Sequence, residues 1–441
     1  MLDHRACARA AALAFLLVPL AATAGNVSVR FDLADPAASP FPSDRYTVRD
    51  WGQNTWRRVN LPKPDCAARP SDCADIDVIN TLDGFSTQPR ITVPFTGDID
   101  LATVNSDTIF LVDLGDTLTM QGAGHKVGIN QVVWDPASKT LAFESDELLA
   151  EHSRYVLVVT DGVHDAQGKR LVPARLEGND GPGRGREDAE YHRDLRDAAR
   201  LRMAGDRHVV AASLFTTQSI SADLAKIMQR IKQSTPAPAD FMVGNAGAVR
   251  AVFPVSGIAG IQFNRQVGTA PSFASSFLPT PALNVIPGAV GQVAFGKFAS
   301  DDYETAGKFI PAVPTRSGTP QPQGSNELVF QLFLPAGAKP AGGWPVAIFG
   351  HGFTDSMYGA PWAVASVFAS RGIATLSINV VGHGGGPLGT LAVLRPAAAP
   401  VVIPAGGRGI DQDGNGSIDS TEGSSAAGAR SAIGNRDGLR Q

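Results

Sequence analysis

The chain has 441 residues, of which 43% are hydrophobic and 18% are charged, and its formal net charge is −4. This is enough apolar material for two or three packed domains at roughly 150 residues each. The lack of a basic excess argues against a protein that binds nucleic acid or an anionic membrane through charge. The 47 glycines and 31 prolines indicate many turns, which favours a β-rich or α/β chain over a helical bundle.

Residues 1–24 have the pattern of a secretory signal peptide. Arg5 and Arg9 precede an apolar run that is too short to span a bilayer comfortably, and the sequence ATA at 22–24 is typical of a cleavage site. A membrane anchor is the alternative, but no later stretch is long and apolar enough to span a membrane. We therefore expect an exported protein that is periplasmic, on the outer surface or secreted.

Residues 25–88 are rich in loops and hold the two cysteines that remain after removal of the signal peptide. Cys66 and Cys73 are separated by the polar sequence AARPSD. In an oxidising compartment two such neighbouring cysteines are expected to pair. Closing so short a loop stabilises a fold by roughly 2–3 kcal/mol in the chain-entropy description. A metal role is not expected, because no histidine or second cysteine pair is close by.

Residues 89–172 have the alternation of a β domain. Short runs rich in β-branched and aromatic residues stand between turn residues, which predicts a β-sandwich. The stretch resembles a bacterial Ig-like domain in the pieces ITVPFTGDIDLATVNSDTIFLVD, WDPASKTLAF and YVLVVTDGVHDAQGKRL. The resemblance implies a spacer or adhesive module without chemistry of its own.

Residues 173–285 are interpreted as a helical connector and a linker. The piece SADLAKIMQRIKQS places Leu224, Ile227, Met228 and Ile231 at helical spacing. The sequence TPAPAD ends this helix.

Residues 286–441 show an α/β pattern. The runs GQVAFGKF, ELVFQLFLP and WPVAIFG are read as strands, APWAVASVFASRG as a helix and IATLSINVVG as a further strand. A helical crossover makes the last two strands parallel. We therefore predict the first half of an α/β domain with a mostly parallel sheet, placed behind the Ig-like β-sandwich.

The third of these strands ends in the sequence GHGF. Glycines after a buried strand let the chain turn sharply beside a substrate, and a backbone N–H at that point is suited to hold an oxyanion. The Phe353 N–H is the best donor candidate, with Gly352 beside it, and His351 is expected to be structural. The alternative is an ordinary turn between a strand and a helix.

The pieces VGQVAFGKFASDDYE, LFLPAGAKPAGGWPVAIFGHGFTDS and ATLSINVVGHGGGP, with FPSDRYT and LDGFST nearer the N-terminus, extend this pattern. They resemble the bacterial virulence-factor lipase N-terminal family and the α/β-hydrolase domain that follows it. The resemblance implies an exported lipase, lysophospholipase or esterase that acts on a lipid or small ester. The sequence contains no G-x-S-x-G, so we expect the nucleophile, acid and base to lie beyond this chain, which alone should be inactive.

Residues 411–422, DQDGNGSIDSTE, have the spacing of a calcium loop, with Gly416 at the turn. Oxygen donors occupy positions 1, 3, 5, 7, 9 and 12 of the loop, namely Asp411, Asp413, Asn415, Ser417, Asp419 and Glu422. This spacing wraps the six to eight oxygens that Ca²⁺ prefers around one point. A metal-free loop of Asx turns is the alternative. Because no partner loop is present, we expect a structural Ca²⁺ bound weakly, with a dissociation constant of about 10⁻⁴–10⁻³ M.

Two hypotheses about function follow from the sequence. The first is the N-terminal portion of an exported serine carboxylic-ester hydrolase. The second is a non-enzymatic exported module, in which the Ig-like domain and the calcium loop serve adhesion or another interaction.

Overall fold

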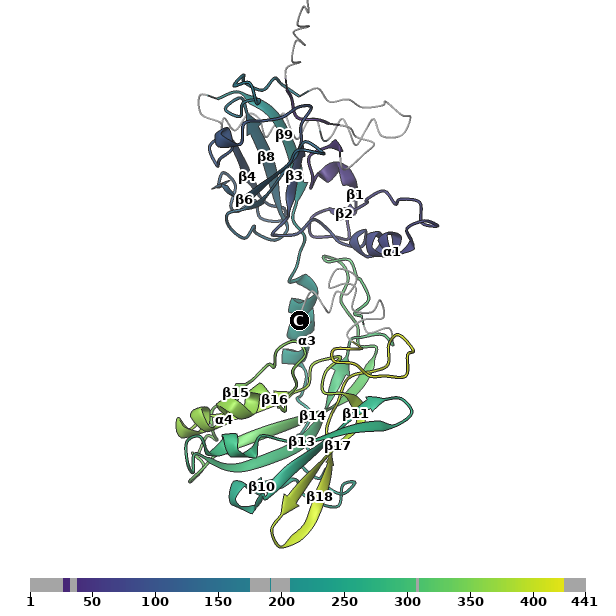
Figure 1. Ribbon diagram of the computed structural model, residues 1–441, viewed down its shortest axis with the longest axis vertical. Helices are drawn as coiled ribbons and strands as arrows, with labels where there is room; N and C mark the ends of the chain where they lie inside the picture. The colour runs from purple at the N-terminus through teal and green to yellow at the C-terminus, as the bar shows by residue number, and fades with distance from the viewer. Residues whose placement is uncertain (1–26, 32–37, 175–190, 192–206, 307–308, 424–441) are drawn as a thin grey trace, which may run out of the picture.

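The computed structural model describes residues 27–31, 38–174, 191, 207–306 and 309–423. Two β-rich lobes are stacked along the long axis of the molecule, with helix α3 (Ala222–Gln233) between them (Figure 1). We call the lobe that holds β1 to β9 the upper lobe and the lobe that holds β10 to β18 the lower lobe. The predicted signal peptide lies outside the described residues.

The upper lobe is a sandwich of two antiparallel sheets. One sheet has the order β3-β7-β6 and the other the order β5-β4-β8-β9. Their strands are β3 (Ile91–Pro94), β4 (Ile109–Asp116), β5 (Lys126–Val127), β6 (Ile129–Asp135), β7 (Thr140–Ser145), β8 (Ser153–Thr160) and β9 (Val209–Thr216).

Side-chain alternation explains why the upper lobe folds in this way. On β4, Ile109 and Leu111 point into the core between the two sheets, while Phe110 and Val112 belong to a second buried cluster on the opposite face. A strand that is apolar on both faces must be covered on both faces. Tyr191 lies in that second cluster, so the four-stranded sheet is not open to water there.

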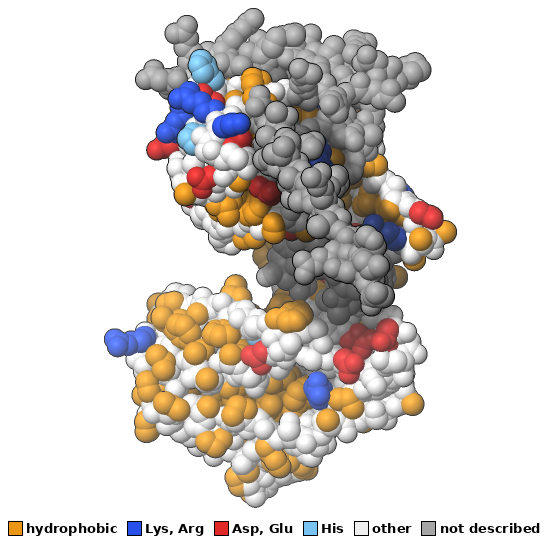
Figure 2. Space-filling model, turned by 45° about the horizontal axis from the view of Figure 1, so that its top comes forward, with side chains coloured by type: hydrophobic (Ala, Val, Ile, Leu, Met, Phe, Trp, Pro, Cys, Tyr) orange, Lys and Arg blue, Asp and Glu red, His pale blue; other side chains and the backbone are white. Residues whose placement is uncertain are grey.

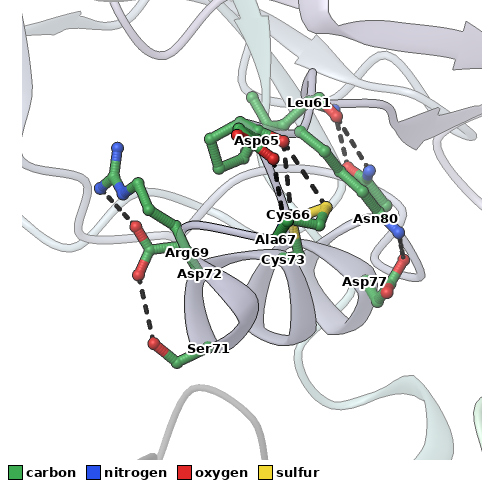
Figure 3. The surroundings of a disulfide bond; sticks show 12 residues. Leu61, Asp65, Cys66, Ala67, Arg69, Ser71, Asp72, Cys73, Asp77 and Asn80 are labelled. Atoms are coloured by element: carbon green, nitrogen blue, oxygen red, sulfur yellow. Dashed lines mark hydrogen bonds and ion pairs between the residues drawn. A yellow bond between two sulfur atoms is a disulfide. The ribbon is translucent and has the colours of Figure 1, made fainter.

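Helix α1 (Pro70–Ile79) and the hairpin of β1 (Thr47–Arg49) and β2 (Arg57–Val59) flank this sandwich. The disulfide predicted from the sequence is present, because Cys66 and Cys73 are joined at the start of α1 (Figure 3). Beyond the other end of the helix, the Asn80 side chain accepts from the Leu61 N–H at 2.7 Å and donates to the Leu61 carbonyl at 3.0 Å. The helix is thereby fastened at both of its ends.

The lower lobe also has two sheets. A five-stranded sheet has the order β10-β13-β14-β16-β15, and a four-stranded sheet has the order β12-β11-β17-β18. Their elements are β10 (Val252–Pro254), β11 (Gly260–Gly268), β12 (Ser272–Phe277), β13 (Val290–Asp302), β14 (Gly324–Pro335), β15 (Val346–Ile348), α4 (Ala360–Ser370), β16 (Ala374–Ile378), β17 (Gly386–Arg395) and β18 (Ala398–Pro404).

The predicted fold class of the lower lobe is wrong. Among the strand ladders of the described residues, β15 and β16 form the one parallel pair, and the others are antiparallel. A parallel pair needs a crossover, and α4 is the connection that provides it. The hairpins β11–β12, β13–β14 and β17–β18 give antiparallel pairs instead. The lobe is therefore a mostly antiparallel β structure and not an α/β-hydrolase domain.

Helix α4 covers one face of the five-stranded sheet. Trp362 is fully buried, and its ring meets that of Phe333 edge to face with centroids 4.9 Å apart. Its indole N–H donates to the Gln331 side-chain oxygen at 3.0 Å, and the Gln331 amide group donates to the Ser377 hydroxyl at 2.9 Å. This buried polar chain fixes the position of α4 on β14 and β16.

The lower lobe exposes several large hydrophobic side chains. Figure 2 shows hydrophobic side chains spread over much of the face of this lobe in view, with most of the acidic side chains in a small group at one side. Strand β15 lies at the edge of its sheet and pairs only with β16 among the described strands. On it and just after it, Val346, Ile348 and Phe353 are 53%, 80% and 74% exposed.

A long connection between β13 and β14 ties the two lobes together, and we call its residues 309–323 the strap. The Thr315 hydroxyl donates to a carboxylate oxygen of Asp83 in the upper lobe at 2.6 Å, and its N–H donates to the Gln53 side chain at 2.8 Å. The Lys226 ammonium group on α3 donates to the Gly318 carbonyl at 2.6 Å. The strap and α3 therefore form a two-part stalk between the lobes.

Candidate calcium site

The calcium-type loop is placed by backbone pairing at both of its ends. The segment before it runs beside the turn that precedes β17, where the Arg408 N–H donates to the His383 carbonyl and the Gly409 N–H to the Gly385 carbonyl, both at 2.8 Å. At the far end of the loop, the Ile410 N–H donates to the Glu422 carbonyl at 3.2 Å. The first and last residues of the twelve-residue segment are thereby brought together.

Three carboxylates converge inside this loop. Asp411, Asp413 and Glu422 each offer an oxygen, and these oxygens lie within 4.8 Å of one another. The Asp411 Oδ1 atom is inaccessible to solvent and has no hydrogen-bond donor, whereas its Oδ2 accepts from the Gly416 N–H at 2.9 Å. A buried carboxylate oxygen without a donor is costly unless a cation satisfies it.

The backbone of the loop is already wound in the form that a cation needs. Asp413 and Asn415 each accept from the N–H two residues ahead, at 3.0 and 2.7 Å. Glycines stand at the two positions with positive φ in the middle of the loop, Gly414 at 75° and Gly416 at 88°. These turns place oxygens of Asp411, Asp413 and Glu422 within 4.8 Å of one another.

The donor set fits calcium better than a softer metal. Carboxylate, amide and carbonyl oxygens suit hard Ca²⁺, and neither histidine nor cysteine belongs to the loop. Glu422, at position 12, now accepts from the N–H groups of Gln412 at 2.6 Å and Asp419 at 2.8 Å. These bonds fix the Glu422 carboxylate, one oxygen of which lies within 4.8 Å of those of Asp411 and Asp413.

The predicted oxyanion loop has a different kind of geometry. His351 donates from Nδ1 to the Gly352 carbonyl at 2.9 Å and accepts at Nε2 from the Val380 N–H at 3.1 Å. His383 does the same with the Val381 carbonyl at 2.8 Å and the Thr354 N–H at 3.2 Å. In each imidazole, both ring nitrogens are therefore hydrogen-bonded to backbone groups.

The two histidines lie together and connect two loops. Their ring centroids are 5.0 Å apart, and the exposed Phe353 ring lies 5.7 Å from that of His383. Burial lowers the pKa of His383 below its usual value, and nearby His351 acts in the same direction. The neutral form of His383 is therefore favoured, as its role as an acceptor for the Thr354 N–H requires.

The structure brings some predicted residues together and leaves others apart. Asp411, Asp413 and Glu422 converge, and the Asn415 side chain joins them by donating to Asp413 Oδ2 at 3.0 Å, whereas the Asp419 carboxylate is not in the cluster. Sequence reasoning missed the neighbours of the loop on β11, which belongs to a segment that we interpreted as a connector. The alternation of apolar Ile261 and Phe263 with polar Gln262 and Asn264 was the available signal.

Comparison with known proteins supports the assignment of the upper lobe. The profile of the bacterial Ig-like domain matches residues 75–176. This range contains β3 to β8, which make up most of both sheets of the sandwich. No curated protein matches the chain.

Solved structures add only a distant similarity. The N-terminal part of the bacterial S-layer protein SbsC aligns at 13% identity over 62% of this chain and 46% of that chain, with a TM-score of 0.18. A longer SbsC structure, residues 31–844, aligns at 13% identity over 61% of this chain and 26% of that chain, also at 0.18. The alignment thus spans less than half of either S-layer structure.

Residues 75–176 of the upper lobe form a bacterial Ig-like domain. Together with the disulfide between Cys66 and Cys73, it indicates an exported or cell-surface protein. No helix in the described part of the chain is both long and apolar enough to cross a membrane.

Proposed function

We propose that this chain is a non-enzymatic exported interaction module, in which an Ig-like domain is held against a lower β lobe that binds Ca²⁺. The observation that carries the proposal is the convergence of Asp411, Asp413 and Glu422 on one point, with the Asp411 Oδ1 atom buried and without a donor. The exposed apolar surface near β15 supports a role in contact with a partner, because soluble monomers seldom expose such groups together. The periplasm, the outer surface and the medium all suit this role.

The calcium ion is proposed to have a structural role. When bound, it would neutralise the three converging carboxylates and satisfy the buried Asp411 oxygen, with Asn415, Asp419 and the Ser417 carbonyl completing the oxygen set. At a dissociation constant of about 10⁻⁴–10⁻³ M, the site would be filled in calcium-rich extracellular fluid.

Calorimetric titration of the purified chain with Ca²⁺ tests the metal. We expect one site, and we expect Glu422→Gln to weaken it at least tenfold, because the substitution removes a charge and one carboxylate oxygen. Glu147→Gln is the matched control, since Glu147 pairs with His125 in the upper lobe far from the loop along the chain. Absence of heat at millimolar Ca²⁺ contradicts the calcium assignment.

Ester turnover tests the non-enzymatic half of the proposal. Both nitrogens of His351 and His383 bind backbone groups, so neither ring is arranged as a general base. We expect no hydrolysis of p-nitrophenyl butyrate above the buffer rate. Turnover that a serine-directed phosphonate abolishes would overturn this half, whatever the result with calcium.

A further inference from the structure

The calcium-type loop meets the end of strand β11. The Ile418 N–H donates to the Val267 carbonyl at 2.9 Å, and the Thr269 N–H donates to the Gly416 carbonyl at 3.1 Å. Between these two bonds, Gly268 and Ser417 form an antiparallel bridge. The middle of the twelve-residue loop therefore pairs with the C-terminal end of β11 and with Thr269, the residue that follows it.

The Ile418 side chain is seated in the lower lobe by the same contact. It is 4% exposed. A Cβ placed on Gly386 would lie 2.7 Å from its Cδ1 atom, and a Cβ placed on Gly409 would lie 2.8 Å from its Cγ2 atom. Both distances are too short for a real side chain, so the glycines leave the space that Ile418 fills.

The close approach of the two backbones also depends on Gly268. A Cβ at this position would lie 2.5 Å from the Ser272 hydroxyl and 3.1 Å from the Gly416 carbonyl oxygen. Gly268 is the last residue of β11, before the turn into β12. The sequence thus keeps side chains away from the line along which the loop and the strand touch.

We infer that β11 acts as the fixed pairing partner of the calcium loop, in the place that a second calcium loop would otherwise take. This inference rests on the proposed calcium site and adds its mode of regulation. A loop that stands alone must be ordered by the ion, whereas this loop is held by a strand that the sheet has already ordered. Ca²⁺ binding and the pairing of residues 267–269 with residues 416–418 are therefore coupled.

The coupling has two directions. An ion that tightens the loop must protect the end of β11, and a change that weakens the pairing must lower the affinity for Ca²⁺ by the same factor. Because β11 also pairs with β12 and β17, the effect of the ion reaches the four-stranded sheet and does not stop at the loop.

Hydrogen exchange on the unmodified full chain, with and without Ca²⁺, gives the first test. We expect Ca²⁺ to slow amide exchange in residues 411–423 and also in residues 264–269. Slowed exchange confined to 411–423 would overturn the inference and leave the calcium site intact. No change in either segment, together with no heat of binding, would instead contradict the calcium site itself.

Thr269→Pro gives the second test, because proline has no N–H to donate to the Gly416 carbonyl. We expect it to raise the calcium dissociation constant about tenfold. Thr269→Ala keeps the N–H and loses only the long 3.4 Å contact of the hydroxyl, so its affinity should stay within about twofold. Equal affinities for the two variants would overturn the inference.

Ile418→Ala keeps the test valid if the proline variant does not fold. Position 8 of the loop supplies no ligand. The substitution therefore removes the packing of Ile418 in the lower lobe and leaves the oxygen ligands unchanged. We expect a several-fold weaker affinity and an unchanged number of sites. Affinity equal to that of the original chain would count against the role of β11.

Discussion

Replacing Thr315 by valine is expected to release the strap from the upper lobe. The Thr315 hydroxyl donates to Asp83, which is 2% exposed, at 2.6 Å and accepts from the Asn54 N–H at 2.9 Å. Valine has nearly the same shape but no hydroxyl, so both bonds are lost, together with the 3.0 Å contact of the hydroxyl with the Gln53 side-chain oxygen.

The size of the effect follows from the charges of these partners. A hydrogen bond to a charged group contributes about 1.5–3 kcal/mol, and one between neutral groups about 0.5–1.5 kcal/mol. The docked strap should therefore lose about 2–4 kcal/mol, which lowers the ratio of docked to released strap roughly 30- to 900-fold. The two lobes keep their own cores, so their separate unfolding should change little.

Trypsin cleavage after Arg316 measures this release. In the docked strap, Arg316 donates to the Trp51 carbonyl and its guanidinium lies 4.3 Å from the centre of the Trp56 ring. When opening and closing are fast, the cleavage rate reports the population of the open strap. Ser317→Ala is the control, because its hydroxyl lies 3.4 Å from the Gly52 carbonyl and contributes little. A cleavage rate in Thr315→Val equal to that of the control would refute the reasoning.

Three further outcomes are expected. Because the pKa of His383 is lowered by burial, its stabilising contribution is complete above about pH 6.5 and is lost as the pH falls through the folded value. His383→Gln should flatten the pH dependence of thermal unfolding below that point, and an unchanged slope would contradict this. Trp362→Phe leaves the Gln331 side-chain oxygen without its donor and should lower the urea-unfolding free energy by about 1–3 kcal/mol; an unchanged midpoint would argue against it. Reducing the Cys66–Cys73 disulfide should destabilise α1 by roughly 2–3 kcal/mol, seen as faster amide exchange in the helix with little change in the sandwich; a change of similar size throughout the upper lobe would contradict a local role.

The Ig-like lobe was predictable because its information is local. Alternation marks β7, and runs of β-branched and aromatic residues mark β4 and β8. The disulfide was predictable as well, since only seven positions separate Cys66 from Cys73. Both features depend on residues that are neighbours in the sequence.

The lower lobe was not predictable to the same extent, because its sheets join distant segments. Strand β11 pairs with β17, so that Ile261 lies opposite Val393. Local patterns identify strands and the parallel crossover through α4, but they do not state which distant strand becomes the neighbour. Strand β12, SFASSF, is exposed along its whole length and lacks the alternation that marks a strand.

The calcium-type loop lies between these two cases. Its spacing is local and was recognised from the sequence, and the structure brings the carboxylates of Asp411, Asp413 and Glu422 together. Its pairing with Val267 and Thr269 is not local, because the partners are about 150 positions apart in the chain. The spacing of a twelve-residue motif predicts which oxygens converge. It does not predict that the end of β11 pairs with the loop.

The stalk of α3 and the strap also has a mechanical consequence. Tension applied along the long axis of the molecule (Figure 1) loads the helix and the docked strap side by side, and Lys226 links the two through the Gly318 carbonyl. Hydrogen bonds loaded in parallel break together and at higher force than bonds that are unzipped one after another. The strap therefore has to detach from Asp83 and Gln53 before the single chain that enters α3 carries the load alone. Below the force that detaches the strap, such a module would transmit tension between its two lobes with little extension. Above that force, the single chain that enters α3 would extend freely.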